Sequence, residues 1–183
     1  MSLAQTYRRR LHELALDQYG YVTTRDAEEL GVPAVELRKL AQRGGLRNVA
    51  YGLYRFEDVP AGDHDQFMEA VLRAGPDAFL TRDAVLAFHE LGLVNPRRIR
   101  VGTPGRVRAA LPNFMEVVHE RLRPEDRTAY EGIPSATVAR ALRDCKGVVM
   151  GDRLAEAFRE AKRRGLLRKD DAARLATDLE IVA

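Results

Sequence analysis

The chain has 183 residues, of which 45% are hydrophobic and 31% are charged, and its formal net charge is +3. This length and balance suit a globular protein with a hydrophobic core, organised as one large domain or two small ones. No apolar run approaches the roughly 20 residues of a membrane span, so we expect neither a membrane partner nor a secretory leader. The single cysteine, Cys145, cannot form an internal disulfide and favours a cytoplasmic protein.

The first third of the chain has the pattern of three helices followed by a short β-hairpin. Leucine and alanine recur at helical spacing before Gly20, and either Thr23 or Thr24 can cap the second helix, which Gly31 ends. Pro33 fits the first turn of the third helix. The predicted elements are helices over Gln5–Tyr19, Thr24–Leu30 and Pro33–Arg43, an extended piece at Tyr21–Val22, and strands over Leu46–Val49 and Leu53–Phe56.

A polar linker that contains Pro and Gly, Glu57–Gly62, predicts a domain boundary. Beyond it we expect helices over Asp63–Arg73, Arg82–Leu91 (capped by Thr81), Ser135–Arg143, Asp152–Arg164 and Lys169–Asp178, and strands over Ile99–Thr103, Val107–Ala110, Phe114–Leu122 and Thr128–Tyr130. The sequence therefore predicts an α+β protein. A winged helix-turn-helix domain is expected at residues 1–58, and a mixed β-sheet and helix domain at residues 59–183.

A helix, a Gly-containing corner, a second helix and a hairpin form the order of a winged helix-turn-helix, which binds DNA. In the third helix, Leu37, Leu40 and Ala41 form a stripe that can be buried. The opposite face is basic, and Glu36 is the only acidic residue among residues 33–56. The alternative is a solvated helical face beside a hairpin without a ligand, but the basic residues gathered after the corner favour DNA.

The N-terminal turn of the third helix, with Ala34, Val35 and Arg38, is expected to meet base edges. Arginine can bind guanine, and small apolar side chains can contact a thymine methyl. The rest of that helix, the start of the second helix and the wing are expected to meet phosphates or the minor groove. The predicted DNA-binding residues are Thr24, Arg25, Ala34, Val35, Arg38, Lys39, Gln42, Arg43, Arg47, Asn48 and Arg55.

Every charged residue from Arg97 to Arg108 is an arginine. Arg98, Arg100, Arg106 and Arg108 alternate on a predicted hairpin, so period-two geometry can place them on one face. That face is either solvated or a second surface for the DNA backbone or for an acidic partner.

No cluster of residues in the sequence predicts catalysis. The histidines have no partners at metal-ligand spacing, no glycine-rich phosphate loop follows a strand, and Cys145 lacks a nucleophile motif. The acidic residues near the predicted strands are scattered, whereas a metal-dependent nuclease needs converging carboxylates. We therefore expect no cofactor, no metal site and no enzymatic activity.

The stretch GYVTTRDAEELGVPAVELRKLAQRGGLRNVAYGLYRF (Gly20–Phe56) resembles the N-terminal domain of the AbiEi family of bacterial antitoxins, which belong to type IV toxin–antitoxin systems. The resemblance extends over three further segments, Arg73–Leu93, Ile99–Pro104 and Gly132–Leu142. Two positions depart from the family pattern. Pro33 stands where Ser or Thr is common, and Ala34-Val35 replace residues that are frequently basic.

This resemblance implies an antitoxin that pairs with a nucleotidyltransferase-like toxin encoded alongside it. The winged helix would repress the shared promoter at inverted repeats in double-stranded DNA, and the C-terminal domain would counter the toxin. Because one winged helix covers about one groove face, we expect two copies on the DNA. The alternative is a solitary winged-helix regulator whose C-terminal domain senses a ligand or a partner; a nucleic-acid-processing enzyme is a third, more distant hypothesis.

Overall fold

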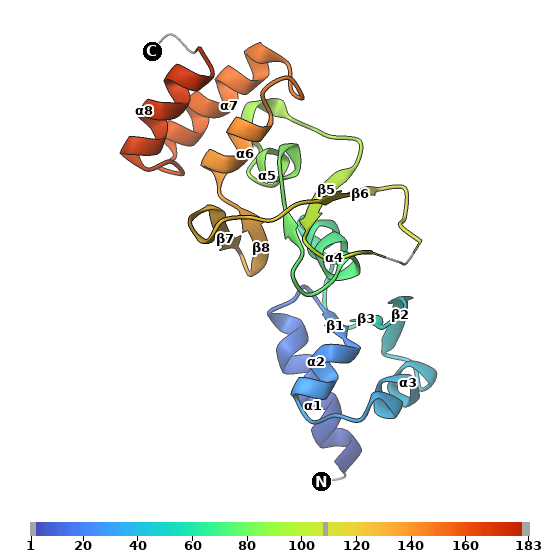
Figure 1. The fold of residues 1–183 in the computed structure, drawn as a ribbon. Helices are drawn as coiled ribbons and strands as arrows, with labels where there is room; N and C mark the ends of the chain where they lie inside the picture. The colour runs from blue at the N-terminus through green and yellow to red at the C-terminus, as the bar shows by residue number, and fades with distance from the viewer. Residues whose placement is uncertain (1–2, 108–109, 181–183) are drawn as a thin grey trace. The chain divides into compact units, whose positions relative to one another are not determined.

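The computed structural model describes residues 3–107 and 110–180, which form two compact units, Met1–Arg73 and Ala74–Ala183. Both units combine helices with a β-sheet, which confirms the predicted α+β class (Figure 1). No helix within these ranges has both the length and the apolar character that a bilayer crossing requires.

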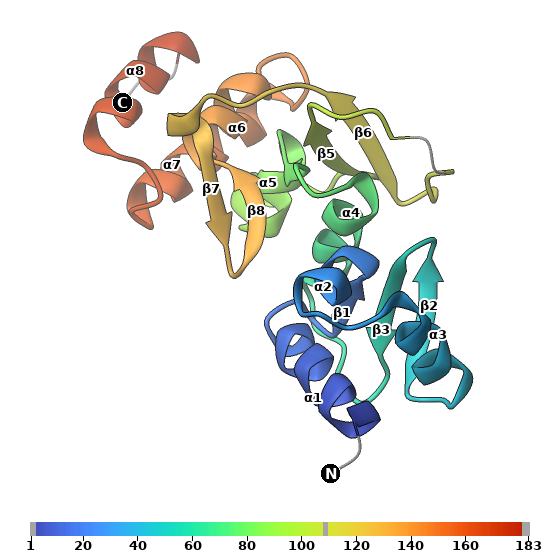
Figure 2. The same ribbon diagram turned by 60° about the horizontal axis from the view of Figure 1, so that its bottom comes forward.

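Unit 1 contains the winged helix that the sequence predicts. Its elements are α1 (Leu3–Leu16), β1 (Tyr21–Thr23), α2 (Thr24–Glu29), α3 (Ala34–Gln42), β2 (Leu46–Ala50), β3 (Leu53–Phe56) and α4 (Asp65–Ala74), at whose end the unit stops. The strands form an antiparallel sheet in the order β1-β3-β2, so β3 is central. Figure 2 shows the β2–β3 hairpin beside α3. This hairpin is called the wing below.

Local signals account for the start of α2 and for the corner after it. The Thr23 hydroxyl accepts from the amide of Asp26 at 3.1 Å, and the Asp26 carboxylate accepts from the amide of Thr23 at 2.6 Å. This reciprocal capping box makes Thr23, rather than Thr24, the cap. The corner closes when the Val32 amide donates to the carbonyl of Ala27 at 2.7 Å, and α3 begins directly after Pro33.

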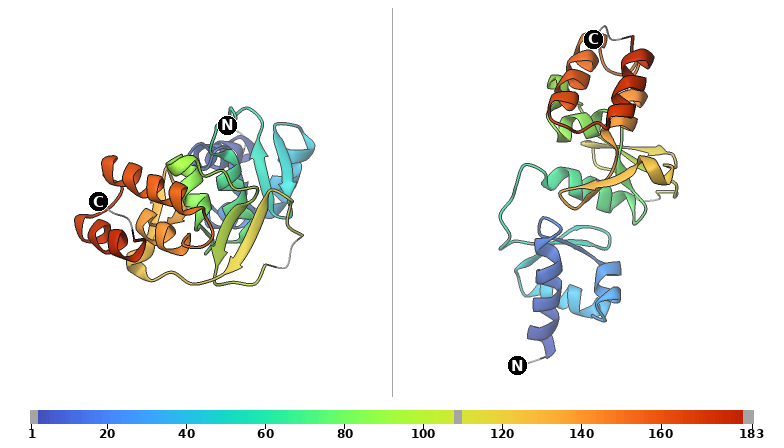
Figure 3. Two further views of the ribbon diagram at one scale, coloured as in Figure 1. Left: turned by 90° about the horizontal axis from the view of Figure 1, so that it is seen from above. Right: turned by 90° about the vertical axis from the view of Figure 1, so that its left-hand side faces the viewer.

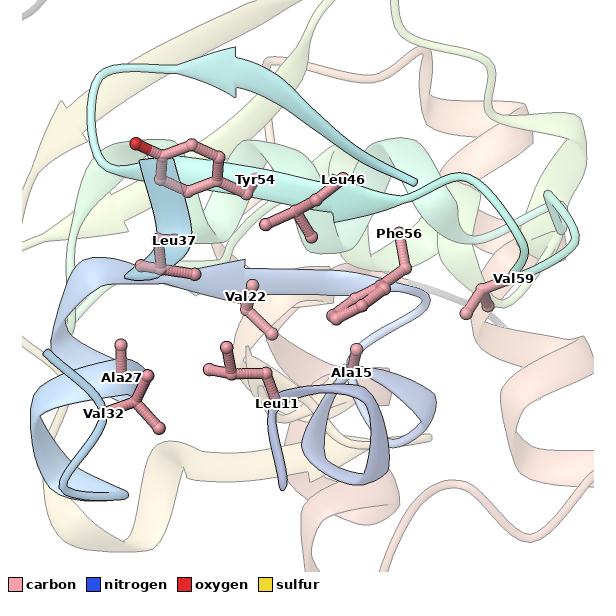
Figure 4. Packing of buried hydrophobic residues seen from close by; sticks show 10 residues of the cluster. All are labelled: Leu11, Ala15, Val22, Ala27, Val32, Leu37, Leu46, Tyr54, Phe56 and Val59. Atoms are coloured by element: carbon pink, nitrogen blue, oxygen red, sulfur yellow. The ribbon is translucent and has the colours of Figure 1, made fainter. Parts of the chain in front are cut away.

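The core of unit 1 is apolar and draws on every element from α1 to β3 (Figure 4). Its buried members are Leu11, Ala15, Val22, Ala27, Val32, Leu37, Leu46, Tyr54, Phe56 and Val59. The predicted stripe of α3 is confirmed, because Leu37 is fully buried and Leu40 and Ala41 pack against the cluster at partial exposure. Since a fully buried Leu contributes about 1.5–3 kcal/mol, this stripe fixes which face of α3 meets solvent.

Helix α4 contacts all three strands of the β1-β3-β2 sheet, called the wing sheet below, through side chains four residues apart. Asp65 pairs with Arg55 of β3, Glu69 accepts from Tyr21 of β1, and Arg73 donates to the Val49 carbonyl of β2. Residues at this spacing share one face of a helix. The compact units therefore divide after α4, whereas the sequence placed a boundary in the linker at residues 57–62. The functional division at residue 58 stays a prediction.

Unit 2 is a mixed five-stranded sheet with helices. Its elements are β4 (Phe79–Leu80), α5 (Asp83–Phe88), the 3₁₀ turn η1 (Leu91–Leu93), β5 (Ile99–Thr103), β6 (Met115–His119), the 3₁₀ turn η2 (Pro124–Asp126), β7 (Arg127–Tyr130), β8 (Ile133–Ala136), α6 (Val138–Asp144), α7 (Gly151–Arg163) and α8 (Lys169–Asp178). The strand order is β6-β5-β4-β8-β7, with β6 parallel to β5 and β4 parallel to β8. Helix α6 contacts α5, α7 and α8 (Figure 3).

Several expectations for unit 2 are wrong. Ser135 does not open a helix, because it lies in β8, and Thr137 caps α6 by accepting from the Arg140 amide at 3.2 Å. Thr81 does not cap α5, whose cap residue is Arg82. The predicted strand at 107–110 is not formed at residues 107 and 110, and residues 108–109 lie outside the described ranges.

Candidate DNA interface

The solvent face of α3 carries the residues predicted to meet DNA. Val35, Arg38, Lys39, Gln42 and Arg43 are exposed, and Ala34 is half-buried at the first turn. Lys39 donates to Glu36 at 2.8 Å, which places that acid on the flank of the helix, where its side chain is only 16% exposed. Arg38 and Arg43 have no ion pair with any residue that the structure describes. Their charges are therefore uncompensated on this face.

The wing adds exposed polar residues next to α3. Arg47 and Asn48 are exposed on β2, and Arg47 also has no ion pair within residues 3–107 and 110–180. Tyr51, at the turn between β2 and β3, is fully exposed. The sequence reasoning did not select Tyr51, although an aromatic residue at the tip of a predicted hairpin is a usable signal for a contact residue.

The start of α2 is only partly open to a ligand. The Thr24 amide donates to the carbonyl of Gly52 at 2.9 Å, and a Cβ at Gly52 would lie 3.0 Å from the Thr24 hydroxyl oxygen. Thr24 therefore contacts the wing, and its amide is not open to a phosphate. Arg25 is exposed and pairs with Glu29 at 2.9 Å. Because exposed pairs on a helix contribute only about 0.3–0.5 kcal/mol, Arg25 and Lys39 can exchange a carboxylate for a phosphate at little cost.

Arg55 does not lie on the DNA-facing surface that the sequence predicted for it. It is buried, with its side chain 10% exposed, and pairs with Asp65, 12% exposed, at 2.9 Å. It also donates to the Pro60 carbonyl at 3.2 Å, and its guanidinium lies 5.6 Å from the ring centroid of Tyr21. The physical reason is that β3 is central and covered on both faces, by the core and by α4. Arg55 is thus a structural residue.

The arginines of residues 97–108 do not share one face of a hairpin. Arg98 and Arg106 are exposed, but Arg100 donates to Asp83 of α5 and lies 3.6 Å from Glu116. Arg100 is 24% exposed, and these two carboxylates neutralise its charge. Arg108 lies outside the described residues. The predicted alternation is therefore wrong at Arg100, and Arg98 and Arg106 stay candidates for a partner surface.

The thiol of Cys145 is buried at the end of α6. Burial raises its pKa to about 12, with smaller contributions from the charges of Asp83 and Asp144. This environment is that of a packed thiol rather than of a nucleophile, which needs a lowered pKa. Among the described residues, no group of three or more His, Cys, Asp and Glu side chains is arranged to hold a metal ion.

Residues 9–56 match the family model described as "Transcriptional regulator, AbiEi antitoxin". This match confirms the resemblance predicted from the sequence and spans the winged helix up to the end of β3. A crystal structure of the RV2827C protein from Mycobacterium tuberculosis aligns with a TM-score of 0.40 at 17% sequence identity, covering 94% of this chain and 81% of that one. No curated protein matches the sequence significantly.

Proposed function

We propose that this chain is a non-enzymatic antitoxin that represses its own operon through the winged helix and counters a nucleotidyltransferase-like toxin through residues 59–183. The observation that carries the proposal is the set of exposed, unpaired arginines, Arg38, Arg43 and Arg47, within the stretch that matches the antitoxin family. A surface with uncompensated positive charge attracts the phosphate backbone and releases its counterions on binding.

In this proposal α3 lies in the major groove. Val35 and Arg38 are its exposed residues nearest the start, so they reach base edges, with Ala34 beside them. Gln42, with Arg43 beyond it at the end of α3, binds phosphates and fixes the register without reading sequence. On the wing, Arg47 and Asn48 contact the DNA sugar–phosphate backbone that borders the groove.

Two copies of the protein are proposed to occupy an inverted repeat at the promoter. A single DNA-binding module buries only about 600–1,000 Å² of protein surface, which limits affinity and specificity at physiological salt. Two symmetry-related copies place their α3 helices in successive major grooves, about 34–36 Å apart. Footprinting of the promoter tests this geometry, because a single unrepeated half-site contradicts it.

The division of labour is tested with fragments cut at the end of α4, beside the point where the compact units divide. A fragment starting at Gly75 is expected to rescue cells that express the partner toxin, but not to bind the promoter in gel-shift assays. The fragment ending at Ala74 is expected to do the reverse. If rescue by the full chain is lost in Arg38→Ala, toxin control runs through repression alone. The solitary regulator is favoured if the neighbouring gene is unrelated to nucleotidyltransferases and the chain rescues no cells from a toxin.

A further inference from the structure

A chain of polar contacts runs from α4 to the outer strand of the wing. The Tyr21 hydroxyl donates to Glu69 at 2.9 Å, Arg73 pairs with Glu69 at 2.7 Å, and Arg73 also donates to the carbonyl of Val49 at 2.9 Å. The side chains of Glu69 and Arg73 are only 15% and 16% exposed. Charged groups this shielded are costly unless each finds a partner, so the geometry of this chain of contacts is strongly constrained.

Arg73 contacts the wing at the point where the hydrogen-bond ladder between β2 and β3 is interrupted. The pairing of β2 with β3 passes from Asn48 opposite Tyr54 to Ala50 opposite Leu53, which leaves Val49 in a bulge without a residue opposite it. A bulge leaves backbone groups unpaired and bends the strand. The guanidinium of Arg73 supplies the Val49 carbonyl with a donor at that point.

The other side of the wing turn is held by α2. Gly52 adopts a positive φ of 69°, and its carbonyl accepts from the Thr24 amide at 2.9 Å. The turn is therefore fixed through Val49 on β2 and through Gly52 within the turn itself. Tyr51 lies between these two anchors with its side chain fully exposed.

We propose that Glu69 and Arg73 are positioning residues that fix the wing, so that Tyr51 contacts the sugar–phosphate backbone of DNA in one geometry. This rests on the proposed function, since it requires the wing to meet DNA. The Tyr51 ring packs on a deoxyribose and its hydroxyl donates to a phosphate oxygen. A turn that is ordered before binding loses less conformational entropy on binding, so the anchors raise DNA affinity without touching DNA themselves.

The absence of tryptophan from the sequence allows a direct test. In a Tyr51→Trp reporter chain, Arg73→Gln is expected to lower the fluorescence anisotropy of the indole without DNA present. In the chain that keeps Tyr51, Arg73→Gln is expected to weaken binding to a fluorescent promoter duplex about tenfold, the loss typical of a hydrogen bond from a charged group. Tyr51→Ala is expected to weaken binding by a similar factor.

Two further variants separate positioning from general instability. Arg73→Lys keeps a cationic donor and is expected to retain most of the anisotropy and affinity. Glu69→Gln keeps an acceptor for Tyr21 and is expected to lower the anisotropy and the affinity less than Arg73→Gln does. Arg159→Gln breaks an exposed Arg–Glu pair on α7 (3.0 Å) and is expected to change neither readout.

Unchanged indole anisotropy in both Arg73→Gln and Glu69→Gln overturns the positioning role. Increased mobility with unchanged DNA affinity overturns its link to DNA. If the wild-type chain binds no promoter DNA at all, the proposed function fails, and the anisotropy measured without DNA still decides whether α4 fixes the wing.

Discussion

Arg38 and Arg47 are both exposed and unpaired, but they lie on different elements and are expected to read different parts of DNA. Arg38→Ala is expected to cost about 1–3 kcal/mol at the cognate site and to relax one base position. Arg47→Ala or Arg43→Ala is expected to weaken binding to all DNA sequences equally. Either substitution is also expected to reduce the slope of log affinity against log salt concentration by about one. Titrations of cognate and scrambled duplexes at several salt concentrations measure both effects. An equal loss on the two duplexes for Arg38→Ala contradicts base reading.

Cys145 gives a prediction that does not depend on DNA. The thiolate is the form that attacks thiol reagents, and burial raises the pKa of this thiol to about 12. Native protein at pH 8 is therefore expected to react far more slowly than unfolded protein. The ordinary value is 9.0, so between pH 9 and pH 12 the unfolded chain loses a proton that the folded chain keeps. Stability is therefore expected to fall as the pH rises through this window.

Labelling with and without denaturant, followed by mass spectrometry, measures the difference in thiol reactivity. Urea titrations at pH 8 and pH 10 measure the change in stability. Cys145→Ala removes the thiol contribution and serves as the control for the alkaline loss. Rapid stoichiometric labelling of the native chain contradicts the prediction.

At the scale of elements, the contact between η1 and α7 depends on one glycine. Gly92 has a φ of 61°, its amide donates to Glu160 at 2.7 Å, and a Cβ there would lie 2.3 Å from the Arg153 carbonyl oxygen. Gly92→Ala is expected to cost about 1–3 kcal/mol, as overpacking does. Gly147→Ala is a matched control, because Gly147 has a φ of 78° but no atom within 4 Å of the added Cβ.

Thermal unfolding compares these two variants, because each kcal/mol of lost stability lowers Tm by about 2–4 °C for a chain of this size. Gly92→Ala is expected to lower Tm by more than Gly147→Ala does. Equal losses would mean that the backbone conformation alone, rather than the close approach of α7, requires glycine at position 92.

The elements that the sequence predicted well are those with local signals. The capping box at Thr23 and the apolar stripe with Leu37 lie within a few residues of the structure they specify. Strand β4 was missed because pairing with distant segments defines it: Leu80 pairs with Val101 on one side and with Ser135 on the other. A strand of two residues has no period that a sequence can display. Strand β8 pairs with the neighbouring β7, and it was missed because Ser135 was interpreted as the start of a helix.

The candidate interface was predictable to the same extent. Helical periodicity placed Arg38 and Arg43 on the solvent face of α3, and the structure agrees on that exposure. The prediction that Arg55 contacts DNA was wrong, because alternation along β3 assumes that one face of the strand is open to solvent. All four residues of this strand are buried. No local pattern in residues 46–56 reveals that α4, which begins at Asp65, covers the second face.

At the scale of the molecule, unit 1 is expected to need α4 in order to fold well. A fragment ending at Asp58 lacks the carboxylate of Asp65 that pairs with Arg55, and it also lacks Glu69 and Arg73. We expect it to melt at a lower temperature and to bind DNA more weakly than a fragment ending at Ala74. Circular dichroism melts and duplex titrations of the two fragments measure the difference, and identical behaviour contradicts it.

A point variant tests the same dependence without removing α4. Asp65→Asn in the longer fragment leaves the guanidinium of Arg55 buried without a carboxylate, and stranding such a charge costs about 3–5 kcal/mol. Asp58→Asn is the comparison, because Asp58 is an exposed partner of Arg8 at 2.7 Å and its loss is expected to cost little.

The attachment of α4 to all three strands of the wing sheet also bears on how such chains are assembled in evolution. The match to the regulator family ends at Phe56, but the last residue that contacts the sheet from α4 is Arg73. A recombination event whose junction falls between these two points separates the sheet from one or more of Asp65, Glu69 and Arg73, and we expect it to damage the fold. Viable gene fusions are therefore expected to have their junctions after the codon for Arg73, so that α4 is inherited with the winged helix even when everything beyond it is replaced.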